Sequence, residues 1–381
     1  MKAIIIESVS AICNLGSEVR NILQALDTGN YGTMQKRMVG GRLVPAGVVT
    51  EDLPHIDEER WQTRTNALVL HCLQRMSHLL GNIQPEKLGV VMGSSNSGID
   101  EYHKAWQAGQ SDDKALELLE VGNVARFVAD RAGAKGPVYT LSTACSSSAK
   151  ALASAARLLR AGVCDAVIAG GGDALCDYAL HGFDALQLIV DQRCKPFTLQ
   201  GGGVNHGEGA ALFLLTTREA KAGDIVLAGY GETADAYHTT TPEPGGVQAT
   251  RAMRMAMEMG NIPPDEIDYV NLHGTGTDAN DNMEIDSMRL CFGENQPPCG
   301  STKPYTGHTL GAAGALEAAF CTMLLQRGTT ELPKQPWLAD FPEVAEKINI
   351  EMHSNRPVQH CISNSFAFGG NNISLLLSRH A

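Results

Sequence analysis

Two segments that begin with Ser-Thr and continue into a helix of small residues constrain this chain more than any other feature. The first, STACSSSAKALASAARLL, begins at Ser142, and the second, STKPYTGHTLGAAGALEAAFCTMLL, begins at Ser301. The distance between packed helices depends on the side chains at their contact, so helices rich in Ala, Gly and Ser let neighbouring backbones approach closely. We therefore expect two central, buried helices. The similarity of the two segments also predicts a chain built from two related halves.

Short apolar runs bounded by turns alternate with longer segments of helical period. Runs typical of buried strands are 3–9, 88–94, 166–172, 211–217, 269–274 and 372–378, and segments of helical period are 61–80, 146–161, 249–260, 280–291 and 311–327. Strands and helices that alternate in this way indicate an α/β protein with layered sheets. The polar segment 218–224 follows a completed strand, and we predict that it separates halves comprising residues 1–222 and 223–381.

Composition and charge exclude several classes of protein. The formal net charge is −12, whereas nucleic-acid binding needs clustered Lys and Arg; an acidic protein partner would need only a local basic patch. The ten cysteines contain no CxxC pair, so neither a metal site nor a disulfide framework is predicted, and a reducing compartment fits them. The N-terminal apolar run is too short for a signal peptide, and no window approaches about 18 apolar residues. We expect a cytoplasmic protein without a membrane span.

Cys145 is the first candidate for chemistry. It follows the strand-like stretch 137–143 and opens the first small-residue helix. A thiol at a helix N-terminus lies in the positive end of the helix dipole, which favours the thiolate, so we expect a lowered thiol pKa. A nucleophile of this kind also needs a base or an electrophile nearby. The alternative is a small buried cysteine, which is what we expect of the other nine.

The segment 269–277 is predicted to be a strand that ends at His273. Catalytic residues often lie on loops at such strand ends, although a lone histidine is more often structural. Thr275 and Thr277 lie two residues apart, so in an extended segment both hydroxyls face the same side. The pair suits the binding of an arm that carries amide groups.

The segment 301–317 places Lys303 and His308 before the second small-residue helix, with Glu317 on that helix. A neighbouring ammonium disfavours a second positive charge, so Lys303 would keep His308 neutral and able to donate a hydrogen bond. Glu317 would pair with Lys303 and make burial of that charge tolerable. Near the C-terminus, the Gly-rich turn NSFAFGGNN (364–372) would aim backbone N–H groups at a developing oxyanion.

Together and in this order, these segments resemble the motifs of the elongating β-ketoacyl-acyl carrier protein synthases. TACSSSAKAL resembles the nucleophile motif, HGTGTDAND the first histidine motif, STKPYTGHTLGAAGALE the lysine-histidine motif and NSFAFGGNN the C-terminal gate loop. DAYHTTTPEP (235–244) is similar to the mobile loop at the active-site entrance. The resemblance covers nearly the whole chain. It implies the α/β thiolase fold, with duplicated halves in a five-layered αβαβα arrangement, and a dimer.

The resemblance also implies a division of roles. Cys145 would take the acyl chain as a thioester, and His273 and His308 would hold the malonyl thioester and stabilise the enolate as carbon dioxide leaves. The backbone amides of Cys145 and Phe368 would form the oxyanion hole. Phe368, followed by Gly369-Gly370, would gate the acyl pocket.

The remaining roles concern support and partners. Thr275 and Thr277 would bind the phosphopantetheine arm, which the acyl carrier protein supplies, and Lys303 and Glu317 would be a supporting pair. The resemblance implies no cofactor of the enzyme's own. The partners would be an acyl carrier protein and either a second copy of the chain or a chain-length-factor-like relative.

One segment departs from the family. Where the family has PFDxxRDGFVxGEGA, this chain has PFTLQGGGVNHGEGA, so Glu208 is kept but Thr198 and Gly201 replace an Asp and an Arg. We expect a more flexible and differently charged entrance loop, which weighs against housekeeping fatty acid synthesis. The segments 93–106 and TACSSSAKAL are most similar to ketosynthases of aryl polyene clusters, which work as heterodimers.

Three alternatives share the fold. A thiolase would need a second catalytic cysteine in a CxG setting, which Cys361 does not provide, and a starter-type synthase would carry Asn in place of His308. A non-catalytic chain-length factor would lack the nucleophile, whereas Cys145 is present. Catalysis is therefore the favoured interpretation.

Overall fold

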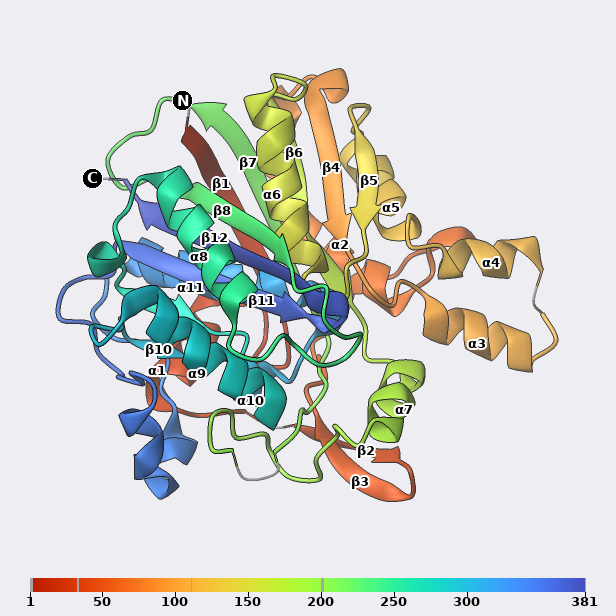
Figure 1. Cartoon of the computed structure of the whole chain (residues 1–381). Helices are drawn as coiled ribbons and strands as arrows, with labels where there is room; N and C mark the ends of the chain where they lie inside the picture. Colours follow the sequence, from red (N-terminus) through yellow and green to blue (C-terminus); the bar gives the residue numbers. More distant parts are fainter. Residues whose placement is uncertain (1–2, 33, 111, 200–201, 381) are drawn as a thin grey trace.

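Ten strands of the described residues form one continuous sheet in two five-stranded parts (Figure 1). The computed structural model describes residues 3–32, 34–110, 112–199 and 202–380. Within those ranges the sheet order is β10-β9-β11-β12-β8-β1-β7-β6-β4-β5. The strands are β1 (Ala3–Ile12), β4 (Leu88–Gly93), β5 (Val138–Leu141), β6 (Ala166–Asp173), β7 (Gly209–Arg218), β8 (Ile225–Ala234), β9 (Tyr269–Asn271), β10 (Cys299–Gly300), β11 (His360–Ala367) and β12 (Asn371–Arg379).

The two parts of the sheet repeat one topology. In chain order, the strands β1, β4, β5, β6 and β7 take the same places as β8, β9, β10, β11 and β12, and the parts meet where Ile5 pairs with Val226. The directions repeat as well, because β7 is antiparallel to both of its neighbours, β12 is antiparallel to both of its own, and the β4–β6 and β9–β11 pairs are parallel. The predicted duplication is therefore present in the structure.

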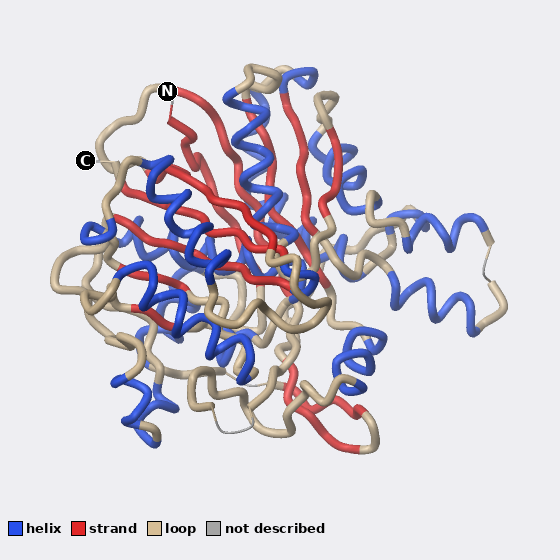
Figure 2. The backbone as a smooth tube through the Cα atoms, viewed as in Figure 1, coloured by secondary structure: helices blue, strands red, loops and turns tan. Residues whose placement is uncertain are grey.

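Helices lie on the outer faces of the two parts of the sheet and between the two parts (Figures 1 and 2). The two predicted central helices, α6 (Ser147–Arg160) and α11 (Ala313–Arg327), contact each other and strands of both parts of the sheet. Almost every residue of α11 is buried, as expected of a helix that is apolar or small on all sides. The two helices approach closely at Gly314 of α11, since a Cβ there would lie 2.6 Å from the Cβ of Ala149 on α6. With helices outside each sheet, this gives the five layers of the thiolase fold.

The outer layers are formed by other helices. α2 (Arg64–Met76) and α5 (Asn123–Ala132) pack on the first part of the sheet, and α8 (Val247–Gly260) packs on the second, with α9 (Asp278–Phe292) beside it. The shorter elements are α1 (Val19–Thr28), α3 (Ile99–Gln107), α4 (Asp113–Leu119), α7 (Asp177–Ala185), α10 (Lys303–Thr306) and the hairpin of β2 (Gln35–Val39) and β3 (Arg42–Ala46). Among the described residues, no helix combines the length and the apolarity that a membrane span requires.

The six predicted strands and five predicted helices are all present, with shifted ends. The largest differences are at 269–274, where the strand ends at Asn271, and at 61–80, where the α-helix covers only Arg64–Met76. The elements that were not predicted are the strands β2, β3, β8, β10 and β11 and the helices α1, α3, α4, α5, α7 and α10. Strands β8 and β11 are interrupted by Gly, Asn and Ser, which weakens the apolar run that identifies a buried strand.

Candidate active site

Cys145 lies in a tight turn between β5 and α6. Ala144 has the left-handed backbone angle φ = 51°, which non-glycine residues rarely adopt. The turn is closed by the Thr143 N–H, which donates to Ser147 Oγ at 2.9 Å, and by the Ser147 N–H, which donates to the Ala144 carbonyl at 3.1 Å. This turn places the thiol just before the helix begins, as predicted.

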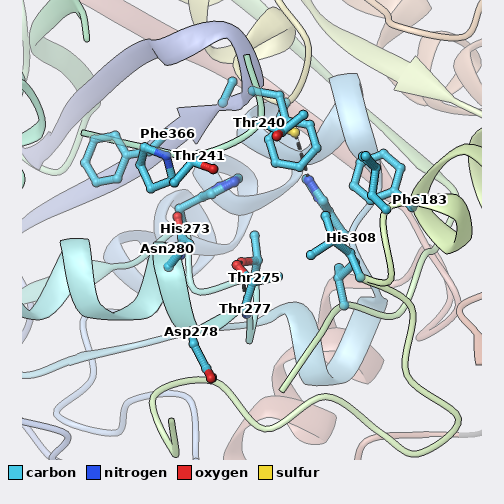
Figure 3. Close-up of a pocket in the computed structure, with 18 of the residues that line it drawn as sticks. Phe183, Thr240, Thr241, His273, Thr275, Thr277, Asp278, Asn280, His308 and Phe366 are labelled. Atoms are coloured by element: carbon cyan, nitrogen blue, oxygen red, sulfur yellow. Dashed lines mark hydrogen bonds between the residues drawn. The ribbon is translucent and has the colours of Figure 1, made fainter. Parts of the chain in front are cut away.

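The His308 imidazole lies against this thiol. His308 Nε2 is 2.9 Å from Cys145 Sγ, and both side chains are buried (Figure 3). The histidine follows α10 and Gly307, whose φ is 70°. Its backbone is fixed on both sides, because its N–H donates to the Asn205 carbonyl at 2.7 Å and its carbonyl accepts from Gly207 N at 3.0 Å. The first half of the chain thus supplies the thiol, and the second supplies the imidazole.

His273 completes the group, with its ring 5.3 Å from that of His308 and nearly perpendicular to it. Lys303 Nζ lies 3.3 Å from His273 Nδ1, also donates to the His273 carbonyl, and is 2.5 Å from Glu317 Oε1. The predicted Lys303–Glu317 pair is present, but the lysine contacts His273 and not His308. An ammonium that donates to Nδ1 fixes the tautomer of His273 with its N–H on Nε2.

Acidic residues that the sequence interpretation missed fix the His273 loop. Glu284 accepts hydrogen bonds from the backbone N–H groups of His273 at 2.7 Å and Gly274 at 2.6 Å. Asp281 accepts from the Gly276 N–H at 3.2 Å and the Phe197 N–H at 2.6 Å. Burial raises the pKa of both carboxyl groups to about 7, and the hydrogen bonds oppose that rise. The signal in the sequence was two acidic residues three apart on the helix that follows HGTGT.

The thiol and both imidazoles are uncharged at neutral pH. Burial raises the pKa of the Cys145 thiol to about 11, although Lys303 and the backbone N–H groups of Phe368 and Cys145 oppose the rise. The expected lowering of this pKa is therefore wrong, because desolvation outweighs the helix terminus. Burial first, and Lys303 second, hold the pKa of His273 and of His308 well below the ordinary value. The neutral state expected of His308 agrees with this lowering, but burial is a larger cause than Lys303.

A cavity of about 380 Å³ opens onto these three side chains. Thr275 and Thr277 line it with their hydroxyl oxygens 3.0 Å apart, so the two face the same side as predicted (Figure 3). The segment 235–244 also contributes to the wall, through Thr240, Thr241 and Pro242. The cavity is therefore lined by a thiol, two neutral imidazoles and a pair of hydroxyls.

The Gly-rich turn closes one side of this cavity. Gly369 and Gly370 have positive φ angles of 80° and 70°, which glycine adopts without steric cost. The turn is tied to the 235–244 segment, because the Gly369 N–H donates to the Thr239 carbonyl at 2.7 Å. The Phe368 ring stacks on Phe183 of α7, with centroids 5.3 Å apart and an interplanar angle of 9°. Phe183 had no distinguishing pattern in the sequence.

The segment that departs from the family lies beside the site. Glu208 is buried and paired with Arg64, whose Nη2 lies 2.6 Å from Glu208 Oε1, and it also accepts from Val49 N at 2.9 Å. Thr198 Oγ1 donates to the Lys195 carbonyl at 2.9 Å. The expectation for Gly201 lies outside the described residues.

Three of these side chains also have the spacing of metal ligands. Cys145 Sγ and one nitrogen each of His273 and His308 all lie within 4.8 Å of one another. The Lys303 ammonium is a fixed cation beside His273 Nδ1 at 3.3 Å, and a metal ion would add a second positive charge there. The electrostatics favour a proton-transfer site over a metal site.

Comparison with known families assigns the chain to a class. Residues 68–221 match the N-terminal domain of β-ketoacyl synthases, and residues 225–334 match their C-terminal domain. The chain therefore belongs to the β-ketoacyl synthase family, and it is an acyltransferase of the elongating, thiolase-fold type.

Several proteins are similar over most of the chain. Nodulation protein E of Rhizobium leguminosarum bv. trifolii is 34% identical over 76% of this chain and 75% of its own length. The 3-oxoacyl-[acyl-carrier-protein] synthase 2 of Staphylococcus aureus (strain COL) is 31% identical over 77% of this chain and 75% of its own. Among solved structures, the ketosynthase ApeO in complex with its chain length factor ApeC from Xenorhabdus doucetiae has a TM-score of 0.90 and 37% identity, covering 100% of this chain and 98% of the chain compared.

Proposed function

We propose that Cys145 accepts the acyl chain from a carrier-protein thioester, with His308 as the base. The observation that carries this assignment is the 2.9 Å separation of Cys145 Sγ and His308 Nε2. As the sulfur attacks the thioester carbonyl, its proton passes to Nε2. The carrier thiol then leaves as the tetrahedral intermediate collapses, and it takes that proton. A base at this distance gives the thiol proton a direct path as the sulfur attacks, although burial raises the pKa of the thiol and lowers the pKa of His308.

The two histidines then serve the malonyl unit. The N–H of His273 Nε2 would donate to the malonyl thioester oxygen, because Lys303 occupies Nδ1 at 3.3 Å. Carbon dioxide leaves, and the electron pair of the broken bond forms the enolate, which the N–H of His273 stabilises and to which His308 would donate in the tautomer with its N–H on Nε2. The enolate carbon attacks the acyl thioester, and the Cys145 thiolate departs and takes up one proton from water, because decarboxylation releases none. Neutral N–H donors in a buried site stabilise charge as it develops.

The oxyanion of each tetrahedral step would be bound by backbone N–H groups. Those of Cys145 and Phe368 already donate toward the sulfur in the resting site and lower the pKa of the thiol. In the resting state the Phe368 ring would close the acyl pocket. Its stack on Phe183 and the flexible Gly369-Gly370 pair support a gate at this turn.

The hydroxyls of Thr275 and Thr277 would bind the phosphopantetheine arm that an acyl carrier protein supplies. Both line the cavity that leads to Cys145. The name of the staphylococcal relative includes the acyl carrier protein, which supports this partner. No cofactor of the enzyme's own enters the proposed steps, and Lys303 with Glu317 would act only as support.

We further propose a polyketide role of the aryl polyene type, as a heterodimer with a chain-length-factor-like relative. The Xenorhabdus ketosynthase, 37% identical, is described in complex with its chain length factor, which supports this partner. The catalytic chain of such a pair keeps its nucleophile and histidines, as this chain does. We place the halves at residues 1–222 and 223–381 and the protein in the cytoplasm.

Acyl transfer to Cys145 is the direct test. The purified protein is incubated with an acylated carrier protein, and the mass adduct is mapped by peptide mass spectrometry. We expect the adduct on Cys145 in the wild type and in Cys72→Ala, which alters another buried cysteine, and no adduct in Cys145→Ala. An adduct on a different cysteine, or an active Cys145→Ala variant, would contradict the assignment.

A further inference from the structure

His206 is a buried histidine that the proposed chemistry does not use. Its side chain is 1% exposed, and neither ring nitrogen has a hydrogen-bond partner among the described residues. A buried polar nitrogen without a partner is costly, and such groups in a folded protein need an explanation. Burial lowers the pKa of the His206 imidazole to about 3, so the ring is neutral and carries one N–H and one lone pair.

The imidazole of His206 contacts the gate through Phe183. The ring centroids of His206 and Phe183 are 4.4 Å apart with an interplanar angle of 77°, and Phe183 stacks on Phe368 at 5.3 Å. An edge-to-face arrangement at this distance allows an N–H of one ring to point at the π face of the other. The π face would then accept the hydrogen bond for which the imidazole has no oxygen or nitrogen partner.

The backbone of His206 is fixed to the active site. Its carbonyl accepts from the Gly47 N–H at 2.9 Å, and the residues on either side of it, Asn205 and Gly207, hold the backbone of His308 at 2.7 and 3.0 Å. An added Cβ at Gly207 would lie 2.1 Å from the Thr306 carbonyl oxygen, so the two segments are packed as closely as backbones allow. His206 is therefore a fixed support, whereas Phe368 stands beside two glycines with wide conformational freedom.

We propose that His206 is a positioning residue for the gate: its ring N–H holds the face of Phe183, and Phe183 holds Phe368 closed over the acyl pocket. This inference rests on the proposed function, which makes Phe368 the gate of an acyl pocket. The contacts of His206 with Phe183 and of Phe183 with Phe368 do not depend on a carrier protein. Loss of the N–H releases Phe183, and the pocket then opens without an acyl chain to open it.

The test compares two alkylating reagents on Cys145. Iodoacetamide needs only the open cavity, whereas N-octyl iodoacetamide also needs the acyl pocket for its tail. The alkylation rates at Cys145 are measured by peptide mass spectrometry, and the rate with N-octyl iodoacetamide is divided by the rate with iodoacetamide. This octyl-to-small ratio measures how open the acyl pocket is, because a change in thiol reactivity affects both rates equally. We expect His206→Leu and His206→Phe, which lack the donor, to raise the octyl-to-small ratio roughly fivefold, which corresponds to about 1 kcal/mol. His206→Gln, which keeps a neutral N–H, stays within about twofold of the wild type on the same scale.

A double-mutant cycle separates positioning from loosened packing. If His206 acts through Phe183, the ratio in His206→Leu/Phe183→Leu is no higher than in Phe183→Leu alone. An unchanged ratio in both donor-lacking variants at an unchanged melting temperature overturns the proposal, and so do additive effects in the cycle. Failure of the proposed function gives a different result: the wild type then takes no acyl group from a carrier protein, while the alkylation ratios still respond as stated.

Discussion

Replacing Lys303 by Met measures how much the ion pair of Lys303 and Glu317 contributes to the stability of the fold. Glu317 is 3% exposed, and Lys303 is its cation at 2.5 Å. Breaking a buried pair by removing one partner costs about 3–5 kcal/mol, because the remaining charge stays uncompensated. The unfolding entropy near 60 °C is about 2.1 cal/mol/K per residue, so for this chain 4 kcal/mol corresponds to a decrease in Tm of about 5 °C.

The loss of stability in Lys303→Met should depend on pH. Burial raises the pKa of Glu317 to about 7 although Lys303 opposes the rise, and loss of Lys303 raises it further. A carboxyl group with a raised folded pKa binds more protons in the folded than in the unfolded state. Stability is therefore lost as the pH rises from the unfolded pKa to the folded one. Lys303→Met should be close to wild type near pH 5, where Glu317 is protonated in both proteins, and its stability deficit should grow above about pH 7, where the wild-type carboxyl ionises first.

Thermal unfolding at both pH values and equal protein concentration is the assay. Lys135→Met is the matched control, since Lys135 and Glu86 form an exposed pair at 3.7 Å whose loss costs at most about 1 kcal/mol. The double variant Lys303→Met/Glu317→Leu should recover most of the loss, because it leaves no buried charge unpaired. The reasoning is refuted if the Tm deficit is equal at pH 5 and pH 8, or if the double variant is as unstable as the single one.

Three further predictions concern catalysis. His273→Ala should still be acylated at Cys145 but should fail to decarboxylate malonyl-carrier protein, whereas the acylation rate of His308→Ala should also fall, by about 10²-fold or more. Acyl transfer and carbon dioxide release are measured separately, and equal effects of the two substitutions would count against the assigned roles. Phe368→Ala should raise malonyl decarboxylation in the absence of an acyl donor, and no increase would place the gate elsewhere. Thr275→Val should raise the KM for malonyl-carrier protein about fivefold with little change in kcat, because one hydrogen bond to the arm is worth about 1 kcal/mol. Steady-state kinetics measure both constants, and a loss confined to kcat would exclude a binding role.

The sequence predicted the main features of the fold and several of the residues that lie together around the cavity. Small-residue helices, apolar strands and the motifs around Cys145, His273 and His308 are local patterns, and the structure places all of them as expected. The duplication was also visible, because both central helices carry the same kind of composition.

Features that depend on contacts between distant segments could not be predicted. The thiol pKa was wrong because burial is a property of the assembled site and not of the helix start. The contact of Lys303 with His273 depends on how the loop after β9 meets α10. Phe183 and His206 carry no periodic signal, and they became visible only as rings that touch across separate elements.

Because α6 and α11 are in close contact, the spacing of these two helices affects the rate of catalysis. The thiol precedes one of these helices and the imidazole precedes the other, so their 2.9 Å separation is set by how near the two helices lie. A methyl group at Gly314 would meet Ala149 Cβ at 2.6 Å and Ser365 Oγ at 2.8 Å. Such a substitution touches no reacting atom, yet by wedging the two helices apart it would lengthen the path of a proton. A displacement of about 1 Å in a reacting geometry can cost about 10²-fold in rate.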